Sequence, residues 1–101
     1  MNGLLVAEEW LDVFPALDNS TRFNILIYLS NEGSKSVTDV CEAFNLQQSS
    51  THHHLAKLLD VRLIDNSYQT PKVSTEPSSF YSITERGKKI LELLLTNNNL
   101  S

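Results

Sequence analysis

Three consecutive histidines, His52, His53 and His54, are the residues of this chain best suited to chemistry. Histidine binds metal ions, transfers protons and donates hydrogen bonds. The surrounding pattern predicts a helix, in which successive side chains point about 100° apart. Three adjacent residues therefore cannot converge on one metal ion, whose ligands need i, i+4 or a similar spacing. The sequence predicts neither a metal site nor another cofactor.

Catalysis finds little support in the sequence. It contains no Gly-rich phosphate loop and no nucleophile elbow, and no carboxylate is placed by sequence to orient the histidines. Cys41 follows Val37 by one helical turn on an apolar stripe, which favours a small buried side chain over a reactive thiol. We expect that the protein is not an enzyme.

The polar residues around the histidines suit hydrogen bonding to the bases of DNA. A glutamine can pair with an adenine edge, a serine can serve several bases, and a histidine can donate to guanine. We expect His54 to pack at the edge of the core, and a solvated polar face without a partner is the less favoured alternative. The expected base-reading residues are Gln48, Ser49, His52 and His53, with Gln47 and Ser50 in the same DNA-binding set.

Three cations are candidates for phosphate contacts, which fix the register on DNA without carrying sequence information. They are Lys57, Arg62 and Lys72. For each of them the alternative is a solvated surface cation, and only for Lys72, on a long flexible wing, are the two interpretations balanced. Arg22 lies at the start of an earlier helix. We expect it to hold an acid such as Asp18 or Glu42 rather than DNA.

Helical spacing predicts two helices before residue 34. The first covers Leu4–Leu17, and Pro15 is expected to bend or end it. The second is capped by Asn19 or Ser20 and stops at residues 31–33. Both are more hydrophobic than one small core requires.

Two further helices follow, joined by a short polar turn. Ser36 and Asp39 resemble a capping arrangement, which opens a helix over residues 37–44. After a turn at residues 45–47, the next helix runs from about residue 48 to residue 60. Its expected inward face consists of Thr51, Leu55, Leu58 and Leu59.

Beyond residue 60 the apolar period changes to two. Residues 63–68 and 80–83 read as antiparallel strands, and Thr84 can cap a last helix. The element order α-α-α-α-β-β-α, mainly α with a small β-hairpin, is that of a winged helix-turn-helix. The hairpin, over about residues 66–80, is the expected wing, placed near the DNA backbone or the minor groove.

The length and charge of the chain limit the mode of DNA binding. We expect one domain over residues 1–96 and a disordered tail over residues 97–101 of the 101 residues. The net charge of −4 argues against indiscriminate binding, which is mostly phosphate neutralisation by Lys and Arg. Residues 1–44 carry −5 and residues 45–101 carry +1, so the donor-rich helix lies in the less acidic half.

The cysteine count and the apolar runs predict a cytoplasmic protein. The single cysteine cannot form an internal disulfide, and the N-terminus lacks a charged region followed by a long apolar run. The apolar stretches are far shorter than the ~20 residues that a membrane helix needs.

The apolar residues of the first and last helices exceed the needs of one domain, which favours a homodimer. Ordinary core packing is the alternative. The expected interface residues are Leu4, Leu5, Trp10, Leu11, Phe14, Leu91, Leu94 and Leu95.

Two segments resemble the arsenical-resistance-repressor (ArsR) family. Residues 17–26, LDNSTRFNIL, are similar to the second-helix signature of that family, and residues 46–58, LQQSSTHHHLAKL, to its recognition helix. Residues 80–89 resemble the junction between wing and last helix in MarR- and PadR-like regulators. The resemblance implies a homodimeric transcriptional regulator that docks two recognition helices into successive major grooves.

The chain departs from the ArsR pattern at two places. Ser36 and Thr38 stand where metal-sensing members have two cysteines, so no thiolate pair is available for a soft metal. Arg62 occupies the usual glycine position after the recognition helix. We therefore expect that helix to end without the left-handed cap that glycine provides.

The leading hypothesis is a homodimeric, sequence-specific DNA-binding repressor whose partner is double-stranded DNA. The alternative from another class is a winged helix that binds proteins without contacting DNA, which the acidic first half also fits. A third interpretation is a sensor that binds a small apolar ligand between the first and last helices. The sequence does not identify an effector.

Overall fold

The computed structural model describes residues 10–70 and 77–100 of the chain. The order of its elements confirms the predicted winged helix-turn-helix, with one short strand added. The elements are α1 (Val13–Leu17), α2 (Ser20–Glu32), β1 (Lys35–Ser36), α3 (Val37–Phe44), α4 (Gln48–Asp60), β2 (Ile64–Gln69), β3 (Ser78–Ile83) and α5 (Glu85–Leu100).

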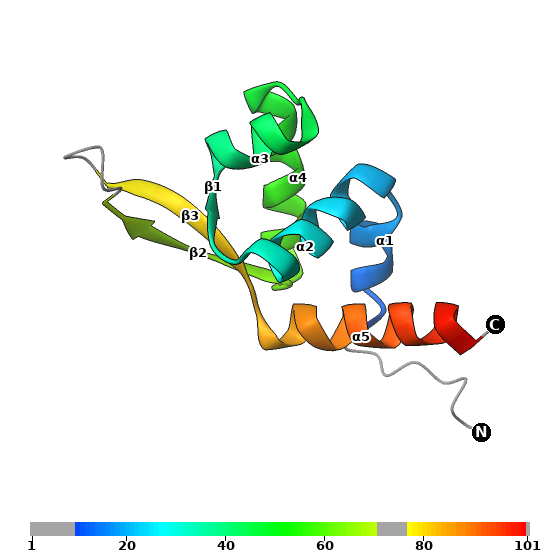
Figure 1. Ribbon diagram of the computed structural model, residues 1–101. Helices are drawn as coiled ribbons and strands as arrows, with labels where there is room; N and C mark the ends of the chain where they lie inside the picture. Colours follow the sequence, from blue (N-terminus) through cyan, green and yellow to red (C-terminus); the bar gives the residue numbers. More distant parts are fainter. Residues whose placement is uncertain (1–9, 71–76, 101) are drawn as a thin grey trace.

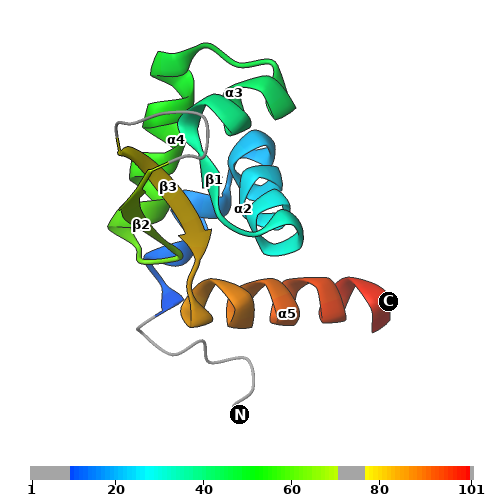
Figure 2. The same cartoon turned by 60° about the vertical axis from the view of Figure 1, so that its left-hand side comes forward.

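The sheet projects from the helices on the side away from α1 (Figure 1). In both views α5 lies at the end of the molecule opposite α3, and α4 lies between α3 and the base of the hairpin (Figures 1 and 2). The helix-turn-helix therefore lies toward the end of the molecule opposite α5, and the wing extends on the side away from α1 (Figure 1).

The three strands form one antiparallel sheet in the order β1-β3-β2. In the hairpin Ile64 pairs with Ile83 and Gln69 with Ser78, so β2 and β3 match the predicted strands closely. The added strand β1 pairs Lys35 with Tyr81. It has only two residues, too few to show a period of two in the sequence.

The core lies between α2, α4, the start of the hairpin and α5. Its apolar side chains follow the helical period of α2 and α4, as the sequence predicted, and then the start of β2. The fully buried residues with the largest side chains include Ile25, Leu26, Leu29, Leu55, Leu58, Leu63 and Ile64.

Side-chain caps set the starts of three helices, and each confirms a prediction. The Asn19 side chain accepts a hydrogen bond from the Arg22 backbone N–H at 2.9 Å, which begins α2. Ser36 and Asp39 form a complete capping box at α3. Thr84 Oγ1 accepts from the Gly87 N–H at 3.0 Å and begins α5. These caps are local in sequence, which is why the pattern of residue types shows them.

The first helix differs from its prediction. The described helix is α1, Val13–Leu17, and residues 4–9 of the predicted span lie outside the described residues. Pro15 does not end it, because it is the third residue of the helix, where its missing N–H has no partner to lose.

The last helix continues to Leu100, past residue 96, where the domain was expected to end. The division into a domain and a disordered tail stays a prediction. No helix in the described part of the chain is long and apolar enough to span a membrane.

Helix α5 approaches the end of α4 closely at Gly87. A Cβ built at this glycine would lie 2.3 Å from the Leu63 carbonyl oxygen and 2.7 Å from Ile83 Cγ1. The same carbonyl accepts a hydrogen bond from the Thr84 N–H at 3.0 Å. A methyl group at position 87 would therefore push α5 away from the segment that follows α4.

We expect Gly87→Ala to destabilise the protein by about 1–3 kcal/mol, the usual cost of an overpacked site. This loss opposes the gain of up to about 1 kcal/mol that alanine normally brings to a helix. Urea unfolding measures the difference. Lys89→Ala, at an exposed site on the same helix, is the control and should stay within about 0.5 kcal/mol of wild type. A stabilised Gly87→Ala protein would contradict the close approach.

Candidate nucleic-acid interface

Helix α4 has one buried face and one exposed face. Thr51, Leu55 and Leu58 are buried, as predicted, whereas Leu59 is half-buried. Ala56 is also exposed on this face. The face and the residue before the helix carry most of the residues expected to contact DNA: Gln47, Gln48, Ser49, Ser50, His52, His53 and Lys57. Position and exposure thus agree with the predicted DNA-binding set, while the contacts themselves stay a prediction.

A hydrogen-bond chain joins the two helices of the helix-turn-helix. Thr51 Oγ1 donates to the Gln47 carbonyl at 3.0 Å and accepts from Cys41 Sγ at 3.2 Å. The buried hydroxyl of Thr51 is therefore satisfied. Cys41 was predicted to be buried, but it is half-buried and bonds to α4. Its place at the edge of the α3–α4 contact explains the difference.

Arg22 is buried, with 8% of its surface exposed. Its Nε donates to the Ala16 carbonyl, its Nη2 lies 3.5 Å from the Pro15 carbonyl, and its Nη1 lies 3.3 Å from Nδ1 of His54. The predicted structural role is confirmed, but the predicted acidic partner is wrong. Carbonyl groups left free at the end of α1 satisfy the guanidinium instead.

His54 lies at the edge of the core, as predicted, and is half-buried. Burial, the Arg22 charge and the neighbouring His53 lower the pKa of His54 below its ordinary value. Burial disfavours the charged form of the ring, and each positive neighbour adds to that effect.

The end of α4 adopts the left-handed conformation that the arginine was expected to prevent. Arg62 has φ 59°, and its N–H bonds to the Leu59 carbonyl while the Leu63 N–H bonds to the Leu58 carbonyl. This pair of bonds is a Schellman motif. Its hydrogen bonds hold Arg62, which is exposed, in a backbone conformation that costs a non-glycine residue about 1–2 kcal/mol.

A second arginine, Arg86 of α5, also contacts the end of α4, and sequence reasoning missed it. Its Nε donates to the Val61 carbonyl at 3.0 Å, and its Nη2 forms an ion pair with Asp12 at 3.3 Å. The guanidinium lies 4.7 Å from the ring centroid of Trp10. These partners are between 25 and 76 residues away along the chain, so no local pattern indicates them.

The exposed face of α4 borders two different clefts. Gln48 and His52 line a cleft of about 630 Å³ between α3 and the wing, together with Tyr68 and Phe80. Lys57 instead lines a smaller cleft with Arg22, Asp60 and residues of α1. The structure therefore separates Lys57 from the Gln48–His52 edge. Lys72 lies outside the described residues.

The described part of the chain contains no group of three His, Cys, Asp or Glu side chains able to hold a metal ion. On the wing, Tyr68 is 75% exposed, and it is the most exposed large apolar side chain among the described residues.

The residues expected at a dimer interface divide into four groups. Leu4 and Leu5 lie outside the described residues, and Leu91 is buried in the core of the protomer. Trp10 is half-buried against Arg86. The remaining four, Leu11, Phe14, Leu94 and Leu95, keep exposed or partly exposed surface.

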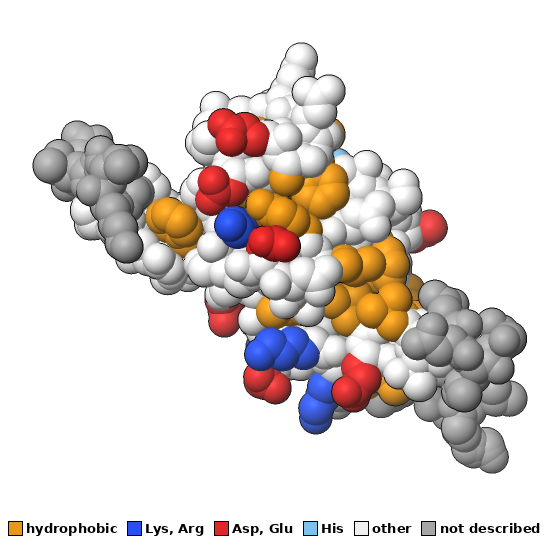
Figure 3. Space-filling model, viewed as in Figure 1, with side chains coloured by type: hydrophobic (Ala, Val, Ile, Leu, Met, Phe, Trp, Pro, Cys, Tyr) orange, Lys and Arg blue, Asp and Glu red, His pale blue; other side chains and the backbone are white. Residues whose placement is uncertain are grey.

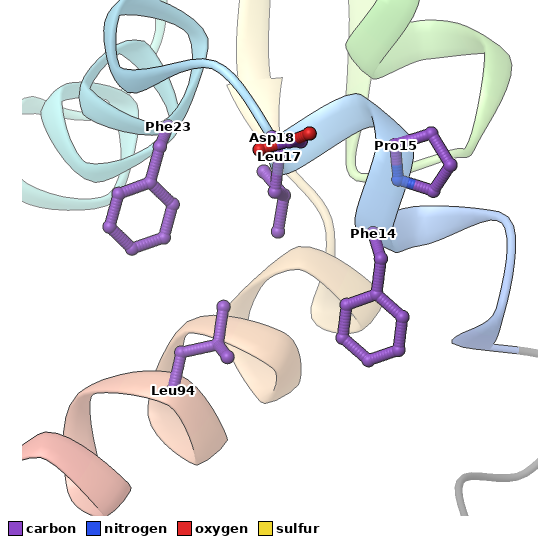
Figure 4. Close-up of a pocket in the computed structure, with 6 residues that line it drawn as sticks. All are labelled: Phe14, Pro15, Leu17, Asp18, Phe23 and Leu94. Carbon is purple, nitrogen blue, oxygen red and sulfur yellow. The ribbon is translucent and has the colours of Figure 1, made fainter.

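Apolar side chains gather on the surface where α1 and α5 meet (Figure 3). At this place Phe14 and Leu17 of α1 and Phe23 of α2 point toward α5, and Leu94 points back toward them (Figure 4). With Pro15 and Asp18 they line an apolar cleft of about 630 Å³. Surface of this kind on a small domain is typical of a contact with another molecule.

Comparison with known families identifies the helix-turn-helix. Residues 19–66, from the cap of α2 to the first residues of the wing, match the model of the bacterial regulatory protein arsR family. The helix-turn-helix of this chain is similar to that of the arsR family. No curated protein sequence gives a match.

Solved structures share the fold of this chain. A transcriptional regulator homologue from Pyrococcus horikoshii superposes with a TM-score of 0.74 at 18% identity, over 93% of each chain. HlyU from Vibrio cholerae superposes with a TM-score of 0.70 at 25% identity, over 85% of this chain and 87% of the HlyU chain. The homodimeric DNA-binding domain of Mycobacterium bovis Mb0332, a possible ArsR-family regulator, superposes with a TM-score of 0.73 at 19% identity. The match covers 91% of this chain and 80% of that domain. The matched family is one of bacterial regulatory proteins, and the solved structures show that the chain shares their fold.

We expect Arg62→Gly to stabilise the protein by about 0.5–1 kcal/mol. Glycine removes the left-handed strain of about 1–2 kcal/mol, and the greater freedom of the unfolded chain returns part of that gain. Lys89→Gly is the matched control, because it replaces an exposed cation inside a helix and should destabilise by about 1 kcal/mol. Urea unfolding of both proteins measures the effects. A loss of stability in Arg62→Gly would contradict the conformation assigned to this residue.

Proposed function

We propose that the protein is a homodimeric, sequence-specific transcriptional repressor that places α4 of each protomer in the major groove of DNA. The observation that carries the proposal is the exposed face of α4. Over residues 48–56 this face has no carboxylate, its polar side chains point outward, and the opposite face is buried in the core. A helix held in this way can enter a groove without unfolding any of its own packing.

The composition of the face favours base readout over simple charge attraction. Gln48 can pair with adenine, His52 and His53 can donate to guanine, and the methyl of Ala56 can contact thymine. Two exposed cations flank this face on the described part of the helix-turn-helix, Lys57 and Arg62. They are available to contact phosphates. With so few cations, affinity should depend only modestly on salt.

The wing and the cleft beside it extend the same surface. Tyr68 projects from β2, and the loop that carries Lys72 joins β2 to β3. We propose that the wing, over residues 66–80, lies along the backbone or the minor groove next to the site of α4. In this arrangement Gln48 and His52 face the wing, while Lys57 faces the opposite flank.

The apolar surface of α1 and α5 supports the homodimer. It lies at the end of the molecule away from α3 and the turn, so a second copy can cover it without hiding the exposed face of α4 (Figure 1). A two-fold dimer would then present two recognition helices, whose half-sites should lie about one helical turn, ~34 Å, or a multiple of it apart.

Selection from random-sequence DNA by the purified protein tests the proposed recognition face. We expect one preferred, two-fold related sequence, and we expect His52→Ala/His53→Ala to bind it at least about tenfold more weakly, because each base contact contributes about 1–3 kcal/mol. Asn24→Ala/Asn31→Ala, two exposed polar residues of α2, is the control and should bind as wild type does. Fluorescence anisotropy gives the dissociation constants.

Equal loss in both double variants would contradict the recognition face. A protein that selects no sequence and ignores duplex DNA, yet retains a protein partner, would instead favour the interaction module without DNA binding.

We expect Phe14→Asp to convert the dimer to a monomer, because a carboxylate in an apolar interface loses its hydration without gaining a partner. Size-exclusion chromatography with light scattering measures the mass, and circular dichroism checks that the variant is folded. Tyr68→Asp makes the same kind of change at the wing and should remain dimeric. A monomeric wild-type protein, or a dimer that Phe14→Asp leaves intact, would overturn the assigned interface.

A further inference from the structure

The recognition helix contacts the body of the protein through a charged group as well as through its apolar face. Arg22 of α2 reaches His54 in the middle of α4, with Nη1 3.3 Å from Nδ1 of the ring. His54 is the third member of the histidine run, and it is set apart from His52 and His53 because it faces inward rather than outward.

The contact fixes the protonation state of the ring. A guanidinium has only donors, so Nδ1 of His54 must accept, which requires a neutral imidazole that carries its proton on Nε2. A proton on Nδ1 would place two donors and two positive charges against each other. The lowered pKa of His54 agrees with this geometry.

Arg22 cannot move away to relieve that repulsion. Its guanidinium is buried and is bound to the Ala16 carbonyl and to the Pro15 carbonyl. Releasing it would leave a buried charge and free carbonyls, which costs more than moving a half-buried side chain. His54, rather than Arg22, must therefore give way.

Other charged groups face this contact from each neighbouring element. Lys57 and Asp60 of α4 and Asp12, which precedes α1, line the same cleft as Arg22. His53 lies next to His54, with ring centroids 5.9 Å apart. The acids favour the protonated ring, and the cations oppose it. None of the ion pairs found among the described residues joins either acid to His54.

We propose that the Arg22–His54 contact positions α4 for DNA and that protonation of His54 breaks it, so that mild acid weakens DNA binding. The inference rests on the proposed function. It makes His54 a positioning residue, in contrast to His52 and His53, whose protonation would strengthen attraction to phosphates.

Protein stability tests the contact without DNA. Because the pKa of His54 is lower in the folded protein, the unfolded state binds more protons between the two pKa values. The stabilising effect is therefore complete above the unfolded value of about 6.5 and is lost as the pH falls toward the folded value. We expect wild type to lose more stability than His54→Asn between pH 7.5 and 5.5, since asparagine offers a neutral acceptor at every pH.

His53→Asn is the matched control for this measurement, because it makes the same substitution at the exposed neighbouring residue and should keep most of the wild-type loss. Urea unfolding at both pH values gives the comparison. His54→Gln replaces His54→Asn if the latter does not fold. Equal losses in wild type and the His54 variant would overturn the inference.

DNA affinity tests the consequence for function. The probe is the duplex that wild type selects from random DNA at pH 7.5. Between pH 7.5 and 5.5 we expect the DNA affinity of wild type to fall by about fivefold or more relative to that of His54→Asn. This factor lies at the low end of the coupling usually found between two linked sites. Effects of His52 and His53 are common to both proteins and cancel in the ratio. An unchanged ratio would contradict the proposal.

Nuclear magnetic resonance separates this inference from the proposed function. In free protein, we expect the backbone amides of α4 to shift with the same midpoint as the His54 ring, and this correlation should vanish in His54→Asn. If the duplex fails to bind at any pH, the proposed function fails while the amide shifts still decide the inference. If the ring titrates and the α4 amides do not follow, His54 only rotates into solvent, and the inference fails.

Discussion

Two arginines, one buried and one half-buried, connect α4 to the rest of the molecule through directional polar contacts. Arg22 contacts the middle of α4 through His54, and Arg86 contacts its end through the Val61 carbonyl. Each also binds α1 or the segment before it, Arg22 through backbone carbonyls and Arg86 through Asp12. Apolar packing alone is non-directional. The hydrogen bonds and the ion pair of the two arginines depend on direction, and they connect α4 to α1 and to the segment before α1. A shift of α4 relative to α1 would therefore break some of these contacts.

This arrangement connects the two surfaces that a dimeric regulator needs. Helix α1 carries Phe14, which belongs to the apolar surface shared with α5, and α4 carries the polar face proposed for DNA. The distance between two recognition helices in a dimer depends on how each protomer places α4 relative to α1. The close approach at Gly87 adds a third constraint, because it joins α5 to the residues directly after α4.

The sequence predicted those parts of the structure that local interactions determine. Caps such as Asn19 and Thr84 act within three residues, and the apolar period of α4 follows from which side of one helix is buried. The outward position of His52 and His53 could be predicted for the same reason. The partners of Arg22 and Arg86 could not, because they come from distant segments. The left-handed Arg62 was missed because the backbone hydrogen bonds of the Schellman motif outweigh the preference of an isolated arginine.

The negative net charge of the protein makes the placement of α4 by the Arg22 and Arg86 contacts more important. A strongly basic domain can bind DNA in many orientations, because phosphate attraction does not depend on exact placement. This chain has a net charge of −4, and the first two turns of α4 carry no Lys or Arg. In the proposed complex, much of the binding energy would therefore come from hydrogen bonds to base edges, which tolerate little displacement. A small movement of α4 should cost this protein more affinity than it would cost a basic one, which is the sensitivity that the proposed role of the Arg22–His54 contact requires.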